Sequence, residues 1–205
     1  MSSGTTVASD LPRVIAPKRH VDPRGWFSET FHEQRLRDLG IACRFVQDNQ
    51  SSSRSAGTLR GLHFQLAPHA QAKLIMVLRG RILDVAVDVR RGSPTYGRYV
   101  SVEISAECGR QLYIPVGFAH GFLTLTDDVL VMYKVSDYYV PALDSGVRWD
   151  DPDIAVPWPI EASDLIISEK DRRLSYLAEF KSPFAYDGHP LVRLASEAEQ
   201  YRVDA

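Results

Sequence analysis

Apolar and polar residues alternate through the middle of the chain. In "KLIMVLRGRILDVAVDVR", residues 73–90, Val85 and Val87 share one face, Asp84 falls on the other, and Gly80 interrupts the run. A two-residue repeat is that of a β-strand, so this segment predicts two strands joined near Gly80. The runs "RYVSVEIS", "RQLYIPV", "HGFLTLT" and "VLVMYKVSDYYV" follow at close spacing with turn residues between them. This rhythm predicts an antiparallel sandwich or barrel.

Helical patterns occur only at the edges of this β-rich region. Residues 32–40 end in Gly40, which is suited to the end of a helix, and Ser168 precedes Asp171 by three residues, as in a capping box. The segment 141–159 is rich in Pro, Asp and Trp and has no clear period. We therefore predict an all-β protein with a few short peripheral helices and an ordered loop wrapped over the sheet.

Composition fits one soluble domain. The 205 residues are 44% apolar and 24% charged, enough to bury a sizeable core. We predict a single domain over 1–205, with the core at about 20–160 and a C-terminal helical segment and tail at about 161–205. Whether the tail is ordered stays open.

Charge disfavours several classes of partner. The formal net charge is −2 and the basic residues are dispersed, so neither nucleic acid nor membrane is an expected partner. The first ten residues lack the basic and apolar regions of a signal peptide, which predicts a cytoplasmic protein. Cys43 and Cys108 form no metal-binding or disulfide pattern.

The string "PVGFAHGF", residues 115–122, has the spacing Pro-x-Gly-x-x-His and resembles the second motif of the cupins, which are small jelly-roll barrels. Metal-binding cupins carry a His-x-His pair in the first motif, but His63 is followed by Phe64 and Gln65. Lys73 stands where an acidic ligand would be sought, and an ammonium repels a divalent cation. His69 is the one possible substitute, so we expect no metal and no cofactor.

A cupin-like barrel with this sequence would have a cationic pocket. His63, His120, Lys73 and Arg60 would share it with Tyr133 from a later strand. Such a pocket suits an anionic ligand and an anionic intermediate.

Several longer strings carry a more specific resemblance. They are "DPRGWFSETF", "QDNQSSSRSAGTLRGLHFQ", "QAKLIMVLRGRILDVAVDVRRGSPTYGRY", "YIPVGFAHGFLTL", "VMYKVSDYY" and "RWDDPDIAVPWP". Together they closely resemble the dTDP-4-dehydrorhamnose 3,5-epimerase family over about residues 13–175. Several long motifs in register are more specific than one short pattern.

The resemblance implies a cupin-type jelly roll and a homodimer. It also implies a cofactor-independent isomerase acting on a nucleotide sugar, dTDP-4-dehydro-6-deoxy-D-glucose. Epimerisation at C3 and C5 would give dTDP-4-dehydro-L-rhamnose for L-rhamnose and polysaccharide biosynthesis. The C4 ketone acidifies both neighbouring C–H bonds, so the reaction needs a base, a group that stabilises the enolate and an acid.

By resemblance, His63 is the base and Asp171 is the carboxylate that orients it. Asp171 would also suit the capping box whatever its role. Tyr133 corresponds to the acid, and Lys73 to the enolate stabiliser. His120 corresponds to a residue that contacts the sugar or its C4 oxygen, or that supports His63 from behind.

Seven further positions match ligand contacts of the family. They are Arg24, Glu29, Gln47, Asn49, Arg60, Asp144 and Lys170. The three cations would neutralise the diphosphate. Asp144 departs from the family, where the longer Glu is expected.

Three other functions stay open. The nearest is a dTDP-4-dehydro-6-deoxyglucose 3-epimerase of another deoxysugar pathway, which would share the base and the acid. A metal-dependent cupin oxygenase or isomerase is disfavoured by the missing His-x-His pair. A non-catalytic sugar-nucleotide sensor is disfavoured because base, acid and stabiliser occur together.

Overall fold

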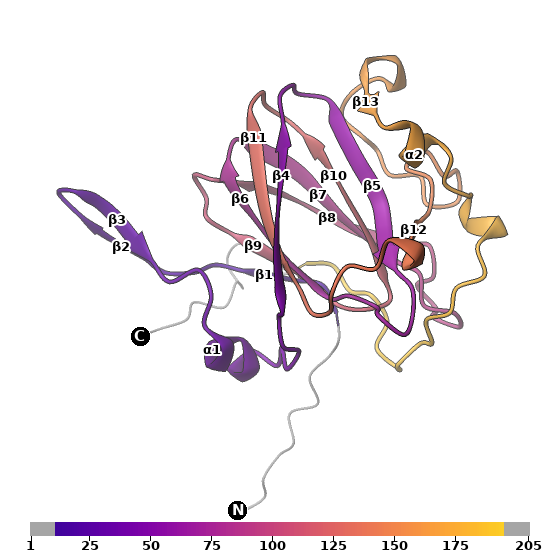
Figure 1. The fold of residues 1–205 in the computed structure, drawn as a ribbon, viewed down its shortest axis with the longest axis horizontal. Coiled ribbons are helices and arrows are strands. Elements are labelled where there is room, and N and C mark those ends of the chain that lie inside the picture. The colour runs from indigo at the N-terminus through magenta and orange to yellow at the C-terminus, as the bar shows by residue number, and fades with distance from the viewer. Residues whose placement is uncertain (1–10, 195–205) are drawn as a thin grey trace, which may run out of the picture.

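Two β-sheets facing each other form the body of the protein (Figure 1). The computed structural model describes residues 11–194. The first sheet has the order β1-β9-β6-β11-β4, and every pair in it is antiparallel. Its strands are β1 (Arg13–Ile15), β4 (Gln47–Ser53), β6 (Lys73–Arg79), β9 (Gln111–Ile114) and β11 (Val129–Val135).

The second sheet has the order β12-β5-β10-β7-β8, and β13 adds to β5 in parallel. Its strands are β5 (Thr58–Gln65), β7 (Arg81–Asp88), β8 (Tyr99–Ser105), β10 (Phe118–Thr124), β12 (Asp144–Gly146) and β13 (Ile166–Ile167). The predicted break near Gly80 is confirmed. Gly80 has a φ of +78°, which favours glycine, and it links β6 in one sheet to β7 in the other.

The alternation predicted for residues 73–90 is also confirmed. Ile82 and Ala86 of β7 face the space between the sheets, whereas Val85 and Val87 face outward and are covered by later segments. The core between the sheets is built from inward residues of both: Ile75, Val77, Ile82, Ala86, Val100, Ile104, Leu112, Phe118, Phe122, Val129 and Val131. Burial of this apolar face holds the two sheets together.

The predicted loop over residues 141–159 wraps the outer face of the second sheet. Val147, Ile154 and Val156 are buried there, and Leu177 and Phe184 continue the cover. The prediction of an ordered loop is therefore confirmed. The loop contains η1 (Pro141–Leu143), and the chain after it contains η2 (Ala162–Asp164), α2 (Glu169–Arg172) and η3 (Leu177–Glu179). Part of the expected tail, 195–205, lies outside the described residues.

Both predicted helices are present, and both are short. Helix α1 (Glu33–Asp38) buries Leu36 and has His32 as its N-cap. At the start of α2, the Ser168 hydroxyl accepts a hydrogen bond from the Asp171 N–H at 3.1 Å. The N-cap half of the predicted capping box is thus observed, whereas the Asp171 carboxylate binds elsewhere.

A two-stranded hairpin projects from the body (Figure 1). It consists of β2 (Arg19–Asp22) and β3 (Gly25–Ser28), and it leaves Trp26 56% and Phe27 70% exposed. The strand pattern did not predict this hairpin. The first sheet also begins earlier than the expected residue 20, because β1 pairs with β9. Within residues 11–194, no helix is long and apolar enough to cross a membrane.

Candidate active site

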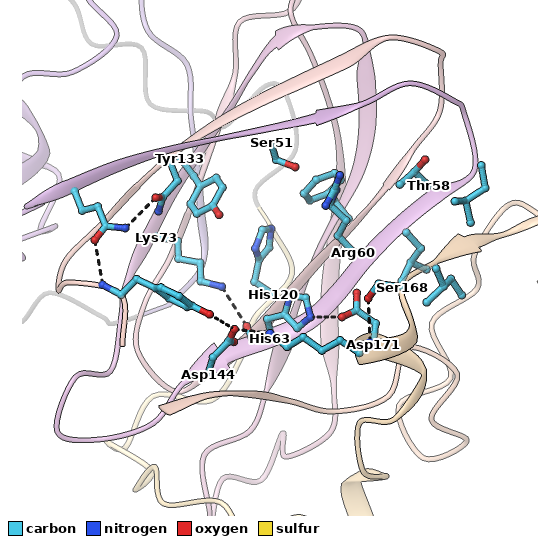
Figure 2. A pocket seen from close by; sticks show the side chains of 18 residues that line it. Ser51, Thr58, Arg60, His63, Lys73, His120, Tyr133, Asp144, Ser168 and Asp171 are labelled. Atoms are coloured by element: carbon cyan, nitrogen blue, oxygen red, sulfur yellow. Dashed lines mark hydrogen bonds and ion pairs between the residues drawn. The ribbon is translucent and has the colours of Figure 1, made fainter. Parts of the chain in front are cut away.

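A cavity of about 690 Å³ opens between the two sheets. Polar side chains from inward strand faces and from α2 line it (Figure 2). Ten of the twelve residues predicted for the site are among its lining: Gln47, Asn49, Arg60, His63, Lys73, His120, Tyr133, Asp144, Lys170 and Asp171. Segments far apart in sequence therefore meet in one place.

An irregularity in β5 turns Arg60 and His63 toward the same cavity. Strand β10 pairs His120 with His63 and Phe122 with Arg60, so a two-residue step on β10 faces a three-residue step on β5. This extra residue is a β-bulge, and without it residues three apart would point to opposite faces. Gly61 permits it, because its φ is +124° and a Cβ there would lie 2.7 Å from the His120 carbonyl oxygen.

His63 and Asp171 form a hydrogen-bonded pair. The distance from His63 Nε2 to Asp171 Oδ1 is 2.8 Å, and Asp171 Oδ2 accepts the Gly61 N–H at 3.1 Å. Burial raises the pKa of the Asp171 carboxyl, but the bonds from His63, Gly61 and Ser168 outweigh it and the pKa is lowered. An ionised Asp171 holds the proton of His63 on Nε2, which leaves Nδ1 with a free lone pair.

A second pair, deeper in the barrel, joins His120 to Asp84. His120 Nε2 lies 2.6 Å from Asp84 Oδ1, and both residues are buried. Burial lowers the pKa of His120 even though Asp84 opposes the change. A neutral ring that donates from Nε2 is an acceptor at Nδ1.

Lys73 and Tyr133 come from adjacent strands of the first sheet. Lys73 lies on the inward face of β6, and its Nζ donates to the His63 carbonyl oxygen at 3.2 Å. Burial lowers the pKa of Lys73 to about 8, against the opposing effect of Asp144 and Asp84. Burial has the opposite effect on Tyr133, because it raises the pKa of the phenol, so the hydroxyl keeps its proton at neutral pH.

Strand β4 presents a polar inward face. The Gln47 amide donates to the Asn49 side-chain oxygen at 2.9 Å. Arg60 is held from the same strand, because its Nε donates to Ser53 Oγ at 3.2 Å and its Nη2 to the Ser52 carbonyl oxygen at 3.0 Å. The guanidinium is thereby fixed beside the cavity.

Asp144 connects two parts of the cavity wall. Its Oδ2 accepts a hydrogen bond from the Tyr139 hydroxyl at 2.7 Å and is paired with Lys170 Nζ. These bonds outweigh burial and lower the pKa of Asp144. In this chain the shorter Asp thus contacts two protein groups.

Arg24 and Glu29 are not brought into this cavity. The Arg24 side chain is 89% exposed and pairs with Asp22 on the projecting hairpin. Glu29 pairs with Arg35 at 2.9 Å. Both residues therefore lie outside the cavity of their own chain, and the hairpin that carries Arg24 points away from the barrel (Figure 1).

Sequence reasoning missed several residues that complete the site. Asp84 was placed opposite the valines of its strand but given no role. Tyr139 was considered only as a competitor of Tyr133. Other unpredicted residues lining the cavity are Ser51, Thr58, Leu59, Phe122, Ile166, Ile167 and Ser168. An acid inside an apolar strand was the available signal for Asp84.

This site defines a class of protein. It is a β-barrel with an aspartate-paired histidine on one sheet and a tyrosine and a lysine on the other. These groups suit proton transfer beside an oxyanion. Within residues 11–194, no three His, Cys, Asp or Glu side chains are grouped so that they could hold a metal ion.

Comparison with known proteins identifies the family. The model of the dTDP-4-dehydrorhamnose 3,5-epimerase family matches residues 10–179. The dTDP-4-dehydrorhamnose 3,5-epimerase of Methanothermobacter thermautotrophicus is 52% identical over 167 residues, which are 81% of this chain and 89% of that protein. The chain belongs to the dTDP-4-dehydrorhamnose 3,5-epimerase family.

Solved structures agree. The dTDP-6-deoxy-D-glucose-3,5-epimerase of Legionella pneumophila, in complex with dTDP-4-keto-L-rhamnose, is 44% identical with a TM-score of 0.79, covering 83% of this chain and 89% of that one. A 3'-monoepimerase of Streptomyces bikiniensis, in complex with dTDP-quinovose, is 37% identical with a TM-score of 0.74, covering 82% and 84%. The predicted cupin-like jelly roll and the predicted carbohydrate epimerase are both confirmed.

Proposed function

We propose that this chain epimerises dTDP-4-dehydro-6-deoxy-D-glucose at C3 and C5 by proton transfer alone. The product is dTDP-4-dehydro-L-rhamnose, a precursor of dTDP-L-rhamnose. The observation that carries the proposal is the His63–Asp171 pair on the second sheet, which faces the same cavity as Tyr133 on the first.

His63 acts as the base through Nδ1. Because Asp171 binds Nε2–H, Nδ1 can take the proton from C3 or C5 while the C–H electrons move toward the C4 oxygen. The imidazolium that forms is stabilised by the ionised Asp171 at 2.8 Å. General-base catalysis of this kind contributes on the order of 10²–10⁴ in rate.

Lys73 stabilises the enolate oxygen. Its ammonium is charged at neutral pH, since its pKa is about 8, and it projects from β6 toward His63. His120 is neutral and bound to Asp84 through Nε2, so its Nδ1 suits a sugar hydroxyl better than an oxyanion. Lys73 is therefore the cation that meets the developing charge.

Tyr133 returns a proton to the opposite face of the sugar. Its phenol O–H bond breaks as the new C–H bond forms and the enolate electrons close on carbon, which restores the ketone. His63 then releases its proton to solvent and Tyr133 regains one. Base and acid lie on different sheets, so a sugar between them presents one face to each.

The diphosphate is bound by cations of the cavity wall. Arg60 is fixed by Ser53 and the Ser52 carbonyl. Lys170 lies in α2, next to Asp171. A guanidinium suits phosphate oxygens because two of its N–H groups can bind at once. Gln47 and Asn49 extend the polar wall along β4.

The functional unit is proposed to be a homodimer. Arg24 and Glu29 match ligand contacts of the family but lie outside their own chain's cavity, and the hairpin exposes Trp26 and Phe27. A hairpin that packs on a second copy would cover those rings and supply Arg24 to the partner's diphosphate. Light scattering that finds only monomer at micromolar concentration would contradict this. A cytoplasmic location and a single epimerase domain over 1–205 stay predictions.

Deuterium exchange tests the proposed reaction. Protein incubated in D₂O with dTDP-4-dehydro-6-deoxyglucose is expected to place deuterium at both C3 and C5, as read by proton NMR of the reduced sugar. No exchange at either carbon would overturn the proposal. Bound sugar nucleotide without exchange would instead support a sensor.

Label at C3 alone would indicate the second candidate, a 3-epimerase. The similarity to the 3'-monoepimerase of Streptomyces bikiniensis supports this function as the alternative. Both reactions use one base and one acid, and they differ in whether the sugar ring turns over before release. The 3,5-epimerase is favoured because the 52% identical relative bears that name.

A further inference from the structure

Strand β4 contains three consecutive serines with different environments. Alternation along the strand turns Ser51 and Ser53 toward the barrel and Ser52 outward, where it is exposed. Ser53 Oγ accepts a hydrogen bond from Arg60 Nε. Ser51 lines the cavity, and its Oγ is buried without a hydrogen-bond partner among the described residues.

A buried hydroxyl without a partner points to a ligand. Leaving such a group unsatisfied is unfavourable by an amount comparable to a lost hydrogen bond, so it is normally paired with protein, water or substrate. The Ser51 hydroxyl faces the cavity rather than the protein interior (Figure 2). A polar atom of a ligand in that cavity would satisfy it.

The register of β4 places Ser51 between two functional groups. Asn49 of β4 lies opposite Tyr133 of the neighbouring strand β11. Further along β4, the side chain of Ser53 binds Arg60. Ser51 lies midway between these inward positions, and Figure 2 shows it between Tyr133 and Arg60. It thus stands between the acid that acts on the sugar ring and the guanidinium that binds the diphosphate.

We propose that the Ser51 hydroxyl binds the C2 hydroxyl of the hexose. The inference rests on the proposed function, which puts C3 and C5 at Tyr133 and the phosphates at Arg60. In the substrate, C2 and C1 lie between the reacting carbon C3 and the first phosphate, and C2 bears the free hydroxyl. Ser51 can both donate to and accept from that group.

The test compares two substrates, dTDP-4-dehydro-6-deoxyglucose and its 2-deoxy analogue, by the rate of deuterium exchange. Ser51→Ala is expected to lower kcat/KM for the 2-hydroxy substrate about fivefold, as for one neutral hydrogen bond, and to leave the 2-deoxy substrate unchanged. Ser101→Ala is the matched control and should change neither rate, since Ser101 is exposed on β8 and does not line the cavity. The comparison removes any general effect of the substitution on the fold.

A second pair of variants repeats the comparison at equal size. Ser51→Thr keeps a hydroxyl and Ser51→Val lacks one, so only the valine variant should lose the preference for the 2-hydroxy substrate. Equal losses on both substrates, or no loss on either, would overturn the C2 contact. Exchange by the wild-type protein decides the proposed function separately, because that measurement involves no change at Ser51.

Discussion

The two histidine–aspartate pairs share a geometry but differ in their surroundings. His63 and His120 are cross-strand partners on β5 and β10, and each places Nε2 within 2.8 Å of a carboxylate oxygen. The His63 side chain is 27% exposed to the cavity, whereas that of His120 is 9% exposed and Asp84 is fully buried.

This contrast teaches that burial, more than pairing, assigns the role. A base must become an imidazolium, which the cavity and Asp171 allow at His63. At His120, burial lowers the pKa and favours the neutral ring, so the Asp84 pair fixes a tautomer. The same two side chains therefore make a proton acceptor in one place and a fixed hydrogen-bonding group in the other.

The largest expected effect comes from removing the proposed base. His63→Ala should reduce deuterium exchange at C3 and C5 by on the order of 10²–10⁴, because no other group would take the proton at that site. His69→Ala is the control, since His69 pairs with Asp137 and does not line the cavity. Activity within tenfold of wild type in His63→Ala would mean that the base lies elsewhere.

Lys73 lies beside both pairs and is the next test. Lys73→Met removes the ammonium but keeps much of the apolar stem, and kcat should fall on the order of 10²–10³, as for loss of an oxyanion donor. Binding of dTDP, measured by calorimetry, should change little because the diphosphate contacts remain. Unchanged kcat would transfer the role of stabiliser to His120.

Substitutions of Asp171 and Asp84 test most directly whether the two histidine–aspartate pairs have different roles. Asp171→Asn should lower kcat by about 10²-fold, because it removes the charge that stabilises the imidazolium and allows the wrong tautomer. Asp84→Asn should lower it by about tenfold or less, since the proposed steps leave the charge of His120 unchanged. Steady-state rates of both variants check the order. A larger loss in Asp84→Asn would reverse the assignment of roles.

Much of the fold and of the site could be predicted from the sequence, because the signals lie within short segments of the chain. The strands follow from alternation, and ten of the twelve site residues lie in motifs whose strands converge on one cavity. Alternation also placed Asp84 on the opposite face of its strand from Val85 and Val87. It did not indicate which face of β7 is the barrel interior, and so the partner of His120 stayed unrecognised.

Two further features depend on chain geometry beyond any single strand. Arg24 matched a ligand position, but only the structure shows that its hairpin leaves the barrel. The bulge at Gly61 is likewise invisible to a two-residue repeat, which would place Arg60 and His63 on opposite faces. Motif matching found both residues without revealing how one strand can point them the same way.

The smallest expected effect concerns pH. A lysine carries its charge below its pKa, so wild-type activity should decline as pH rises through about 8, where Lys73 loses its proton. The negative charges of Asp144 and Asp84 both raise the pKa of Lys73. Asp84→Asn removes one of them, so the alkaline decline should begin at a lower pH.

The pH profile of kcat measures this shift, with Asp150→Asn as control, since Asp150 pairs with Arg148 away from the cavity. The variant and the control lose the same formal charge, so a shift confined to Asp84→Asn arises at Lys73. An unmoved profile would mean that Asp84 acts only through His120. The two pairs would then be electrostatically separate, although their histidines face each other across neighbouring strands.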